Sequence, residues 1–159
     1  MTENQKVKLS DYRALAEFRY QIRRFVHFSE EAARHAAVEP QHHQLMLAIK
    51  GKPDDEAARI AYLAERLQIQ HHSAVELVDR LDKKGLITRT RGEHDRREVY
   101  VQLTPRGERI LDALTVHTRD ELRSAAPALV ATLRQLTQQE KTGRAARHHP
   151  RRVVAGRSK

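Results

Sequence analysis

Two short segments near the middle of the chain place their apolar residues with the period of an α-helix. Both use positions i, i+3, i+4 and i+7, namely Ile60, Leu63, Ala64 and Leu67, and then Ala74, Leu77, Val78 and Leu81. Only Gln68, Ile69 and Gln70 separate the two stripes. Two amphipathic helices joined by so short a turn predict a helix-turn-helix, whose second helix covers residues 70–84.

The hydrophobic period changes after Gly85, a residue that suits the left-handed position beyond a helix end. Residues 99–103 alternate apolar and more polar side chains, which is typical of a strand. Residues 86–91 can pair with this strand, which leaves 92–97 as the hairpin tip. The sequence therefore predicts a mainly α fold with a small β-hairpin wing over 86–103, that is, a winged helix-turn-helix core. Such a core indicates DNA binding.

Longer helical patterns flank this core on its N-terminal side. Ser10 is expected to cap a helix that ends near Val38. Pro40 is expected to open a second helix that stops at Gly51, because proline suits the first helical position.

The C-terminal part begins with a strong helix start signal. Thr104 is a good N-cap and Pro105 occupies the first helical position. Pro127 is expected to break or kink this helix, and a last helix should stop near Gly143. Residues 141–159 have no hydrophobic period and are expected to form a basic, disordered tail.

The terminal helices, over residues 10–38 and 105–140, contain more apolar surface than a small winged core needs. Burying that surface against a second copy predicts an isologous homodimer. The expected organisation is a flexible segment at 1–9 and a single domain at 10–140, with the winged core at 40–104.

Three signatures occur in order through the winged core: LVDRLDKKGLITR at 77–89, DRR at 95–97 and LTPRG at 103–107. With the flanking helices, the chain over roughly 10–140 resembles the MarR family of bacterial transcription regulators. The resemblance implies a homodimer that binds DNA through paired winged helices and often releases it when a small ligand binds. It also suggests a short third strand at 59–60.

The net charge of +9 is unevenly distributed. Seven cationic residues and no acidic ones lie in 141–159, which leaves +2 for residues 1–140. Between Lys83 and Arg97, by contrast, six cations face only two acidic residues. The positive charge of the domain is thus concentrated on the proposed wing, where phosphates would be met.

A recognition helix presents its N-terminal side chains to base edges in the major groove. In this chain the candidates are Gln70, His71, His72, Ser73 and Glu76. Glutamine suits adenine, histidine can donate to guanine, and a carboxylate can accept from cytosine N4. The alternative is a plain solvated surface. Ser73 and Glu76 also have the spacing of a capping box, which would start the helix later and make Glu76 a cap.

The wing tip has its own candidates. Arg96 and Arg97 suit phosphates or a narrow minor groove, and the resemblance pairs Asp95 with Arg97. A surface ion pair of little energetic value is the alternative. Further phosphate candidates, which could equally be solvated charges, are Lys83, Lys84, Arg89 and Arg91.

Ten histidines raise the possibility of metal binding. Adjacent helical residues point about 100° apart, which is poor geometry for chelation, and no HExxH spacing occurs. A metal-responsive regulator would need His27, His43 and His117 brought together by folding. More simply, His43 and His117 line a helix interface or an effector pocket, and neither a metal nor a cofactor is predicted.

Composition and motifs also bear on where the protein resides and on whether it is an enzyme. The absence of cysteine fits a reducing compartment, and no apolar run is long enough for a membrane span or a signal peptide, so we expect a cytoplasmic protein. No catalytic arrangement of residues is apparent, which argues against an enzyme. The leading hypothesis is a homodimeric repressor that binds a pseudo-palindromic duplex and responds to a small-molecule effector. The alternative is a winged-helix module that binds an acidic protein.

Overall fold

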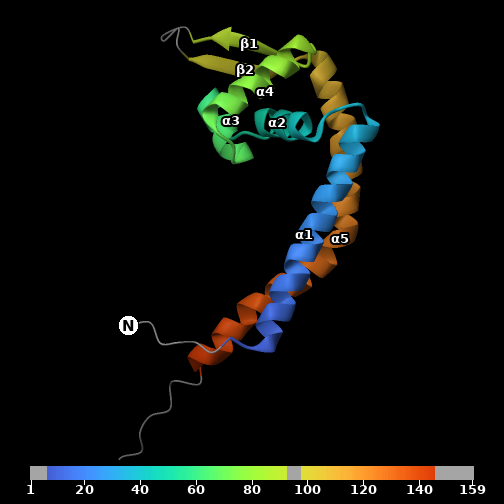
Figure 1. The fold of residues 1–159 in the computed structure, drawn as a ribbon, viewed down its shortest axis with the longest axis vertical. Coiled ribbons are helices and arrows are strands. Elements are labelled where there is room, and N and C mark those ends of the chain that lie inside the picture. Colours follow the sequence, from blue (N-terminus) through green and yellow to red (C-terminus); the bar gives the residue numbers. More distant parts are fainter. Residues whose placement is uncertain (1–6, 93–97, 146–159) are drawn as a thin grey trace, which may run out of the picture. The chain divides into compact units, whose positions relative to one another are not determined.

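The computed structural model describes residues 7–92 and 98–145, and Figure 1 shows how the elements follow one another. In chain order they are α1 (Leu9–His35), α2 (Pro40–Lys50), α3 (Ile60–Leu67), α4 (His71–Lys83), β1 (Ile87–Arg91), β2 (Val99–Leu103) and α5 (Pro105–Ala145). The predicted fold class, mainly α with a β-hairpin, is confirmed. None of the described helices has a stretch long and apolar enough to cross a lipid bilayer.

Residue contacts divide the chain into two compact units. We call Phe25–Arg123 the winged unit. The terminal-helix unit combines residues 9–24 of α1 with residues 124–145 of α5. Both long helices therefore contribute to both units, and each unit is described separately below.

The winged unit is built around α2, α3 and α4, which contact one another and the hairpin. Its buried core contains Leu45, Met46, Ile49, Ala58, Leu63, Leu77, Val78, Leu81, Leu86, Ile87, Val101 and Leu111. Leu63 of α3 and the three residues from α4 belong to the apolar stripes that the sequence pattern predicted. A fully buried leucine or isoleucine stabilises a fold by about 1.5–3 kcal/mol. Burial of these stripes therefore fixes how the two helices of the helix-turn-helix face one another.

The hairpin is antiparallel, with Ile87 opposite Leu103 at its base and Arg91 opposite Val99 towards its tip. The third strand suggested for residues 59–60 reduces to one isolated bridge between Arg59 and Tyr100.

Three helices end with the same backbone motif. In each, a residue with positive φ is followed by an apolar residue whose N–H bonds back to the last helical turn. The pairs are Ala37–Val38 after α1, Gln68–Ile69 after α3 and Gly85–Leu86 after α4. The motif after α3 makes the tight turn of the helix-turn-helix, and the motif after α4 directs the chain into the wing.

The start of α5 is fixed against the base of the wing. The Thr104 hydroxyl accepts from the Gly107 N–H at 3.0 Å and donates to the Gly85 carbonyl at 2.8 Å. A Cβ added at Gly107 would lie 2.1 Å from the carbonyl oxygen of Leu86. Glycine is therefore required at this close approach of two backbones. The predicted cap at Thr104 is confirmed.

The boundaries predicted for α1 need correction. The helix begins at Leu9 and ends at His35, so Ser10 lies inside it rather than capping it. The Asp11 carboxylate instead accepts the Lys8 N–H at 2.7 Å. A carboxylate near a helix N-terminus is favoured by the helix dipole, which explains why Asp11 takes this position.

Of the break or kink predicted at Pro127, the break does not occur, because α5 continues through this residue to Ala145 and past Gly143. A proline inside a helix removes one backbone hydrogen bond but leaves the rest of the ladder. Residues 146–159, which hold most of the expected basic tail, lie outside the described part of the chain.

The terminal-helix unit has few buried side chains, among them Ala14, Gln21 and Thr132. Several large apolar residues of this unit are instead exposed, namely Leu9, Tyr12, Leu15, Tyr20, Ile22, Val130 and Leu133. A helical pair with this much exposed apolar surface is typical of an interaction face.

Candidate nucleic-acid interface

The side chains of α4 differ sharply in burial. Its apolar stripe, Ala74, Leu77, Val78 and Leu81, is buried in the core of the winged unit. The predicted base-reading residues lie over the first two turns of the helix. Gln70 is the N-cap residue, His71, His72 and Glu76 are exposed, and Ser73 is half-buried. The structure thus brings these five side chains together on the first two turns of one helix.

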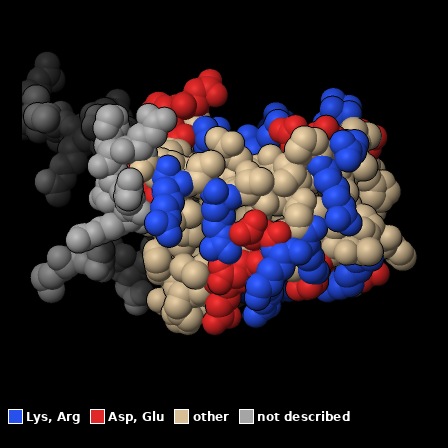
Figure 2. All heavy atoms as spheres, turned by 90° about the horizontal axis from the view of Figure 1, so that it is seen from above, with Lys and Arg blue, Asp and Glu red and all other residues tan. Residues whose placement is uncertain are grey.

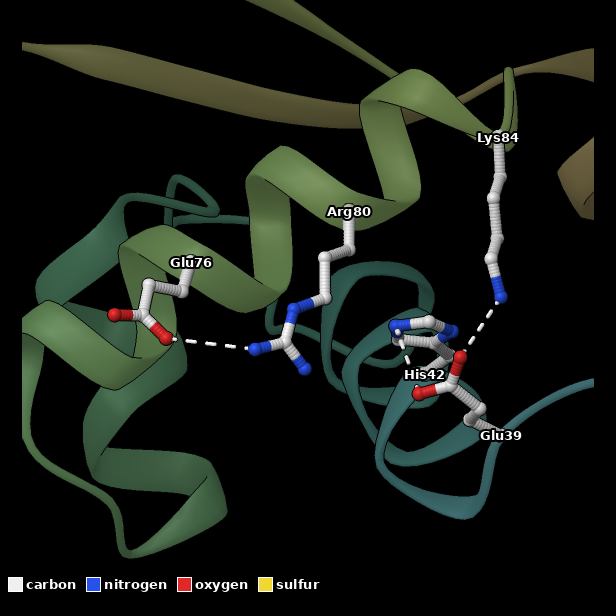
Figure 3. A network of polar contacts seen from close by, with 5 residues as sticks. All are labelled: Glu39, His42, Glu76, Arg80 and Lys84. Carbon is white, nitrogen blue, oxygen red and sulfur yellow. Dashed lines mark hydrogen bonds and ion pairs between the residues drawn. The ribbon is translucent and has the colours of Figure 1, made fainter.

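The capping box considered for Ser73 and Glu76 is wrong. The helix starts at His71, so Ser73 already lies within its first turn. Glu76 instead accepts a hydrogen bond from Arg80 at 3.5 Å (Figure 3). Arg80, which the sequence reasoning missed, is recognisable from the i, i+4 spacing of opposite charges.

The C-terminal end of α4 joins the start of α2 through an ion pair. The Lys84 ammonium donates to the Glu39 carboxylate at 2.9 Å, and this carboxylate also lies 3.7 Å from the His42 ring (Figure 3). The hydrogen bond from Lys84 is the main reason that the pKa of Glu39 is lowered. Lys84, predicted as a phosphate contact, therefore has a partner within the protein, although Lys83 and Lys84 are both exposed.

Arg89 of β1 is likewise balanced by acidic residues. Its guanidinium lies 2.5 Å from Asp79 and 3.0 Å from Asp82, both on α4. These contacts join strand β1 of the hairpin to helix α4. They also compete with the phosphate contact predicted for Arg89.

The outer part of the wing contains Arg91 and the predicted residues of the hairpin tip. Arg91 is exposed at the end of β1. The strands are closed beyond it by a hydrogen bond from the Gly92 N–H to the Glu98 carbonyl at 2.9 Å. Asp95, Arg96 and Arg97 lie outside the described residues, so their contacts remain predictions.

A cluster beside the tip-side end of the hairpin strands was not anticipated from the sequence. The Arg59 guanidinium lies 3.4 Å from the Glu98 carboxylate and 5.8 Å from the centre of the Tyr100 ring. The Tyr100 hydroxyl donates to Glu98 at 2.5 Å, and this bond is the main reason that the pKa of Tyr100 is raised. Figure 2, viewed from the hairpin side, shows lysine and arginine side chains interspersed with acidic ones.

The three histidines proposed for ligand binding lie in different environments. His43 is fully buried, His27 is exposed, and His117 is exposed with its ring centre 5.0 Å from that of Phe28. Within residues 7–92 and 98–145, no group of three potential metal ligands is found.

His42 and His43 form an adjacent, fully buried pair in α2. Among the described residues neither ring has a hydrogen-bond partner. Burial lowers the pKa of both histidines, because a charged imidazolium loses its hydration there. For His42 the nearby cations Lys84 and Arg80 act in the same direction and Glu39 opposes them.

Two pockets open on the winged unit. The larger, of about 530 Å³, lies between α1, α2 and the end of α3, and it includes Phe25, Gln44, Leu47, Arg66 and Ile69. None of the three proposed ligand-binding histidines is among its described lining residues.

The smaller pocket, of about 330 Å³, lies between the helix-turn-helix and the wing. It is lined by Arg59, Ile60, Ala61, His71, Val75, Arg89, Glu98 and Val99. It therefore lies between the tip-side half of the hairpin and the N-terminal end of α4.

Comparison with known proteins gives a consistent result. Residues 38–98 match the model of the MarR family. The transcriptional regulator SarZ of Staphylococcus epidermidis is 37% identical over 62 residues, which are 39% of this chain and 42% of SarZ. The chain thus spans less than half the length of this curated relative.

Two solved structures share the fold at low sequence identity. A variant of MarR from E. coli, complexed with operator DNA, has a TM-score of 0.60 and 20% identity, over 76% of this chain and 88% of that one. BpsR of Bordetella bronchiseptica, described with regulation of its DNA binding by 6-hydroxynicotinic acid, has a TM-score of 0.57 and 19% identity, over 77% and 94%. The winged core over residues 38–98 therefore matches the MarR family of transcription regulators, and the chain shares the fold of these two solved proteins.

Proposed function

We propose that this protein is a homodimeric, DNA-binding transcription regulator that acts as a repressor and is released from DNA by a small-molecule effector. The observation that carries the proposal is the arrangement of α4. One side of this helix is buried against the core, while the polar side chains of His71, His72 and Glu76 on its first two turns are exposed. A helix supported in this way can enter a major groove and present residues 70–76 to base edges.

Dimer formation is supported by the terminal-helix unit. Its exposed apolar side chains, for example Tyr12, Leu15, Ile22 and Leu133, would be removed from water by a second copy. A two-fold dimer would present two recognition helices to half-sites about one helical turn apart. This geometry predicts a pseudo-palindromic operator.

Effector control is supported by the larger pocket of the winged unit. Its volume of about 530 Å³ lies within the range of about 300–1,000 Å³ that is usual for small-ligand sites. BpsR, which shares the fold, is described with regulation of DNA binding by a small aromatic acid. An effector that binds better to a form with another helix spacing would shift the population away from DNA.

A titration of a labelled duplex pool over a series of salt concentrations tests the central claim. Binding should weaken steeply as salt rises, because neutralised phosphates release counterions. Light scattering on the same samples should give the mass of two chains. A stable dimer without affinity for any duplex would instead favour a protein-interaction module, and a monomer would contradict the dimer.

Small molecules can then be screened for release of the bound duplex. Release by a compound that leaves the protein folded would support effector control. A protein that no compound releases would be a constitutive DNA binder.

A further inference from the structure

Arg59 occupies a position where its side chain is unfavourable for local structure. It is the N-cap residue of α3 (φ −83°, ψ 158°), and no side-chain cap hydrogen bond is made there among the described residues. Serine, threonine, aspartate and asparagine are preferred at this position because they accept from free helix N–H groups. Arginine cannot accept, and its charge opposes the positive end of the helix dipole. A residue that breaks a local rule is a candidate functional residue.

The Arg59 side chain is nevertheless held in place. Glu98 lies 3.4 Å from its Nε, and Tyr100 lies beneath the guanidinium at 5.8 Å from the ring centre. Tyr100 also donates to Glu98 at 2.5 Å, so the two supporting residues fix one another. The side chain of Arg59 remains 52% exposed. Because a guanidinium has five donors, a single carboxylate contact leaves donors for a further acceptor.

The position of Arg59 fits an acceptor on DNA. In a helix-turn-helix the first helix crosses the DNA backbone while the second enters the major groove. Arg59 stands at the start of that first helix and is bridged to the wing at Tyr100. It also lines the same pocket as His71, which belongs to the base-reading end of α4.

We propose that Arg59 contacts a phosphate of the DNA backbone between the recognition helix and the wing, and that Glu98 and Tyr100 position its guanidinium for this contact. The inference rests on the proposed DNA binding. It adds a sequence-independent contact that neither the charge pattern nor the family signatures assign. Glu98 repels phosphate by its own charge, so its part is to orient Arg59.

The test compares two half-exposed, ion-paired arginines of the winged unit in the full-length protein. Arg34, near the end of α1, pairs with Glu30 and Glu31, and its side chain is 50% exposed. Arg59→Gln and Arg34→Gln therefore each remove one charge from an arginine that already has an acidic partner. Affinity for a duplex chosen by selection is measured over a salt series, and thermal melting checks the fold of each variant.

Arg59→Gln is expected to weaken binding about tenfold at moderate salt and to lower the slope of log affinity against log salt by about one, with sequence preference unchanged. Arg34→Gln should match the wild type. Arg59→Lys should restore the slope, because the charge returns, but only part of the affinity, because lysine lacks the planar fork.

Glu98→Gln separates positioning from simple charge removal. It should weaken binding in the wild type, although it removes a negative charge, and it should have no such effect when Arg59 is already glutamine. Stronger binding of Glu98→Gln would overturn the positioning role. An unchanged salt slope for Arg59→Gln, or equal losses for the two arginine variants, would overturn the phosphate contact while leaving the proposed function intact. A wild-type protein that binds no duplex would overturn both.

Discussion

The two ends of α4 differ in how firmly the rest of the protein holds them. At the N-terminal end, Gln70 supplies no side-chain cap within the described residues, and His71 and His72 are exposed. At the C-terminal end the chain is tied down. Lys84 pairs with Glu39, and Gly85 and Leu86 close the helix through backbone hydrogen bonds. One end is therefore left free to meet a partner, and the other anchors the helix.

The comparison shows that an exposed cation of the winged unit can already have an acidic partner within the protein. Arg89 and Lys84 are cations of the winged unit, yet both are balanced by acidic residues of the same protein. We expect changes at the C-terminal end to affect stability and changes at the N-terminal end to affect recognition. Substitutions at each end can break this distinction or sharpen it.

The largest effect is expected for Gly107→Ala, next to the anchored end. The added Cβ would lie 2.1 Å from the Leu86 carbonyl oxygen, so the start of α5 or the base of the wing must move. A loss of about 3 kcal/mol in the free energy of unfolding is expected, at the upper end for overpacking.

Gly85→Ala is the matched control, because its Cβ meets nothing within 4 Å and only the positive φ opposes it. It should cost about 1 kcal/mol, or somewhat more, from backbone strain. Chemical denaturation of both variants would measure the difference, and equal losses would contradict the steric argument.

Acid should weaken the anchored end through the buried histidines. Because the pKa of His42 and of His43 is lowered in the fold, the unfolded chain binds more protons than the folded chain below pH 6.5. The neutral histidines therefore make their full contribution to the stability of the fold above pH 6.5, and this contribution is lost as the pH falls below 6.5. Each histidine can contribute a slope of up to about 1.4 kcal/mol per pH unit.

Denaturation at several pH values checks this dependence. Glu39, Arg80 and Lys84 are the charged groups around His42, so their own variants should alter its share of the slope. His43→Met should remove one histidine's part of the slope. A slope that is independent of both buried histidines would contradict their neutral state in the fold.

Arg89→Gln should have a smaller effect on stability. The change leaves Asp79 and Asp82 without their shared cation, and these partly exposed groups make a loss of about 1 kcal/mol reasonable. Arg91→Gln, at an exposed position two residues along the same strand, should leave stability unaffected. A lower salt slope of DNA binding for Arg89→Gln but not for Arg91→Gln would contradict this distinction. It would make Arg89 a phosphate contact and Arg91 a solvated charge.

The smallest effect on stability is expected at the free end. His71→Ala removes an exposed side chain, so the free energy of unfolding should change by no more than about 0.5 kcal/mol. The preferred base at one operator position should nevertheless change, because direct readout depends on such side chains. Selection of bound duplexes with His71→Ala and with His27→Ala would compare two exposed histidines of the winged unit. An unchanged preference in both would remove His71 from the reading surface.

Much of the fold could be predicted because its signals are local. The apolar stripes containing Leu63 and Leu77 set the faces of α3 and α4, and Thr104 and Pro105 set the start of α5. The errors came where a local signal had a competitor. Ser73 has the spacing of a capping box, but the turn closed by Gln68 already starts α4 at His71. Pro127 removes one hydrogen bond from a helix that is long enough to continue without it.

By itself the sequence determined the periodic elements, their order and the resemblance to a family, since periodicity and short motifs depend on residues close together in the chain. Only the tertiary structure decided which cations have partners. The bond from Arg89 to Asp82 spans seven positions and that from Lys84 to Glu39 spans 45. The same holds for the support of Arg59 by Glu98 and for the burial of His42 and His43. Electrostatic contacts depend on distances in space, which the fold sets by packing apolar stripes that carry no information about charge.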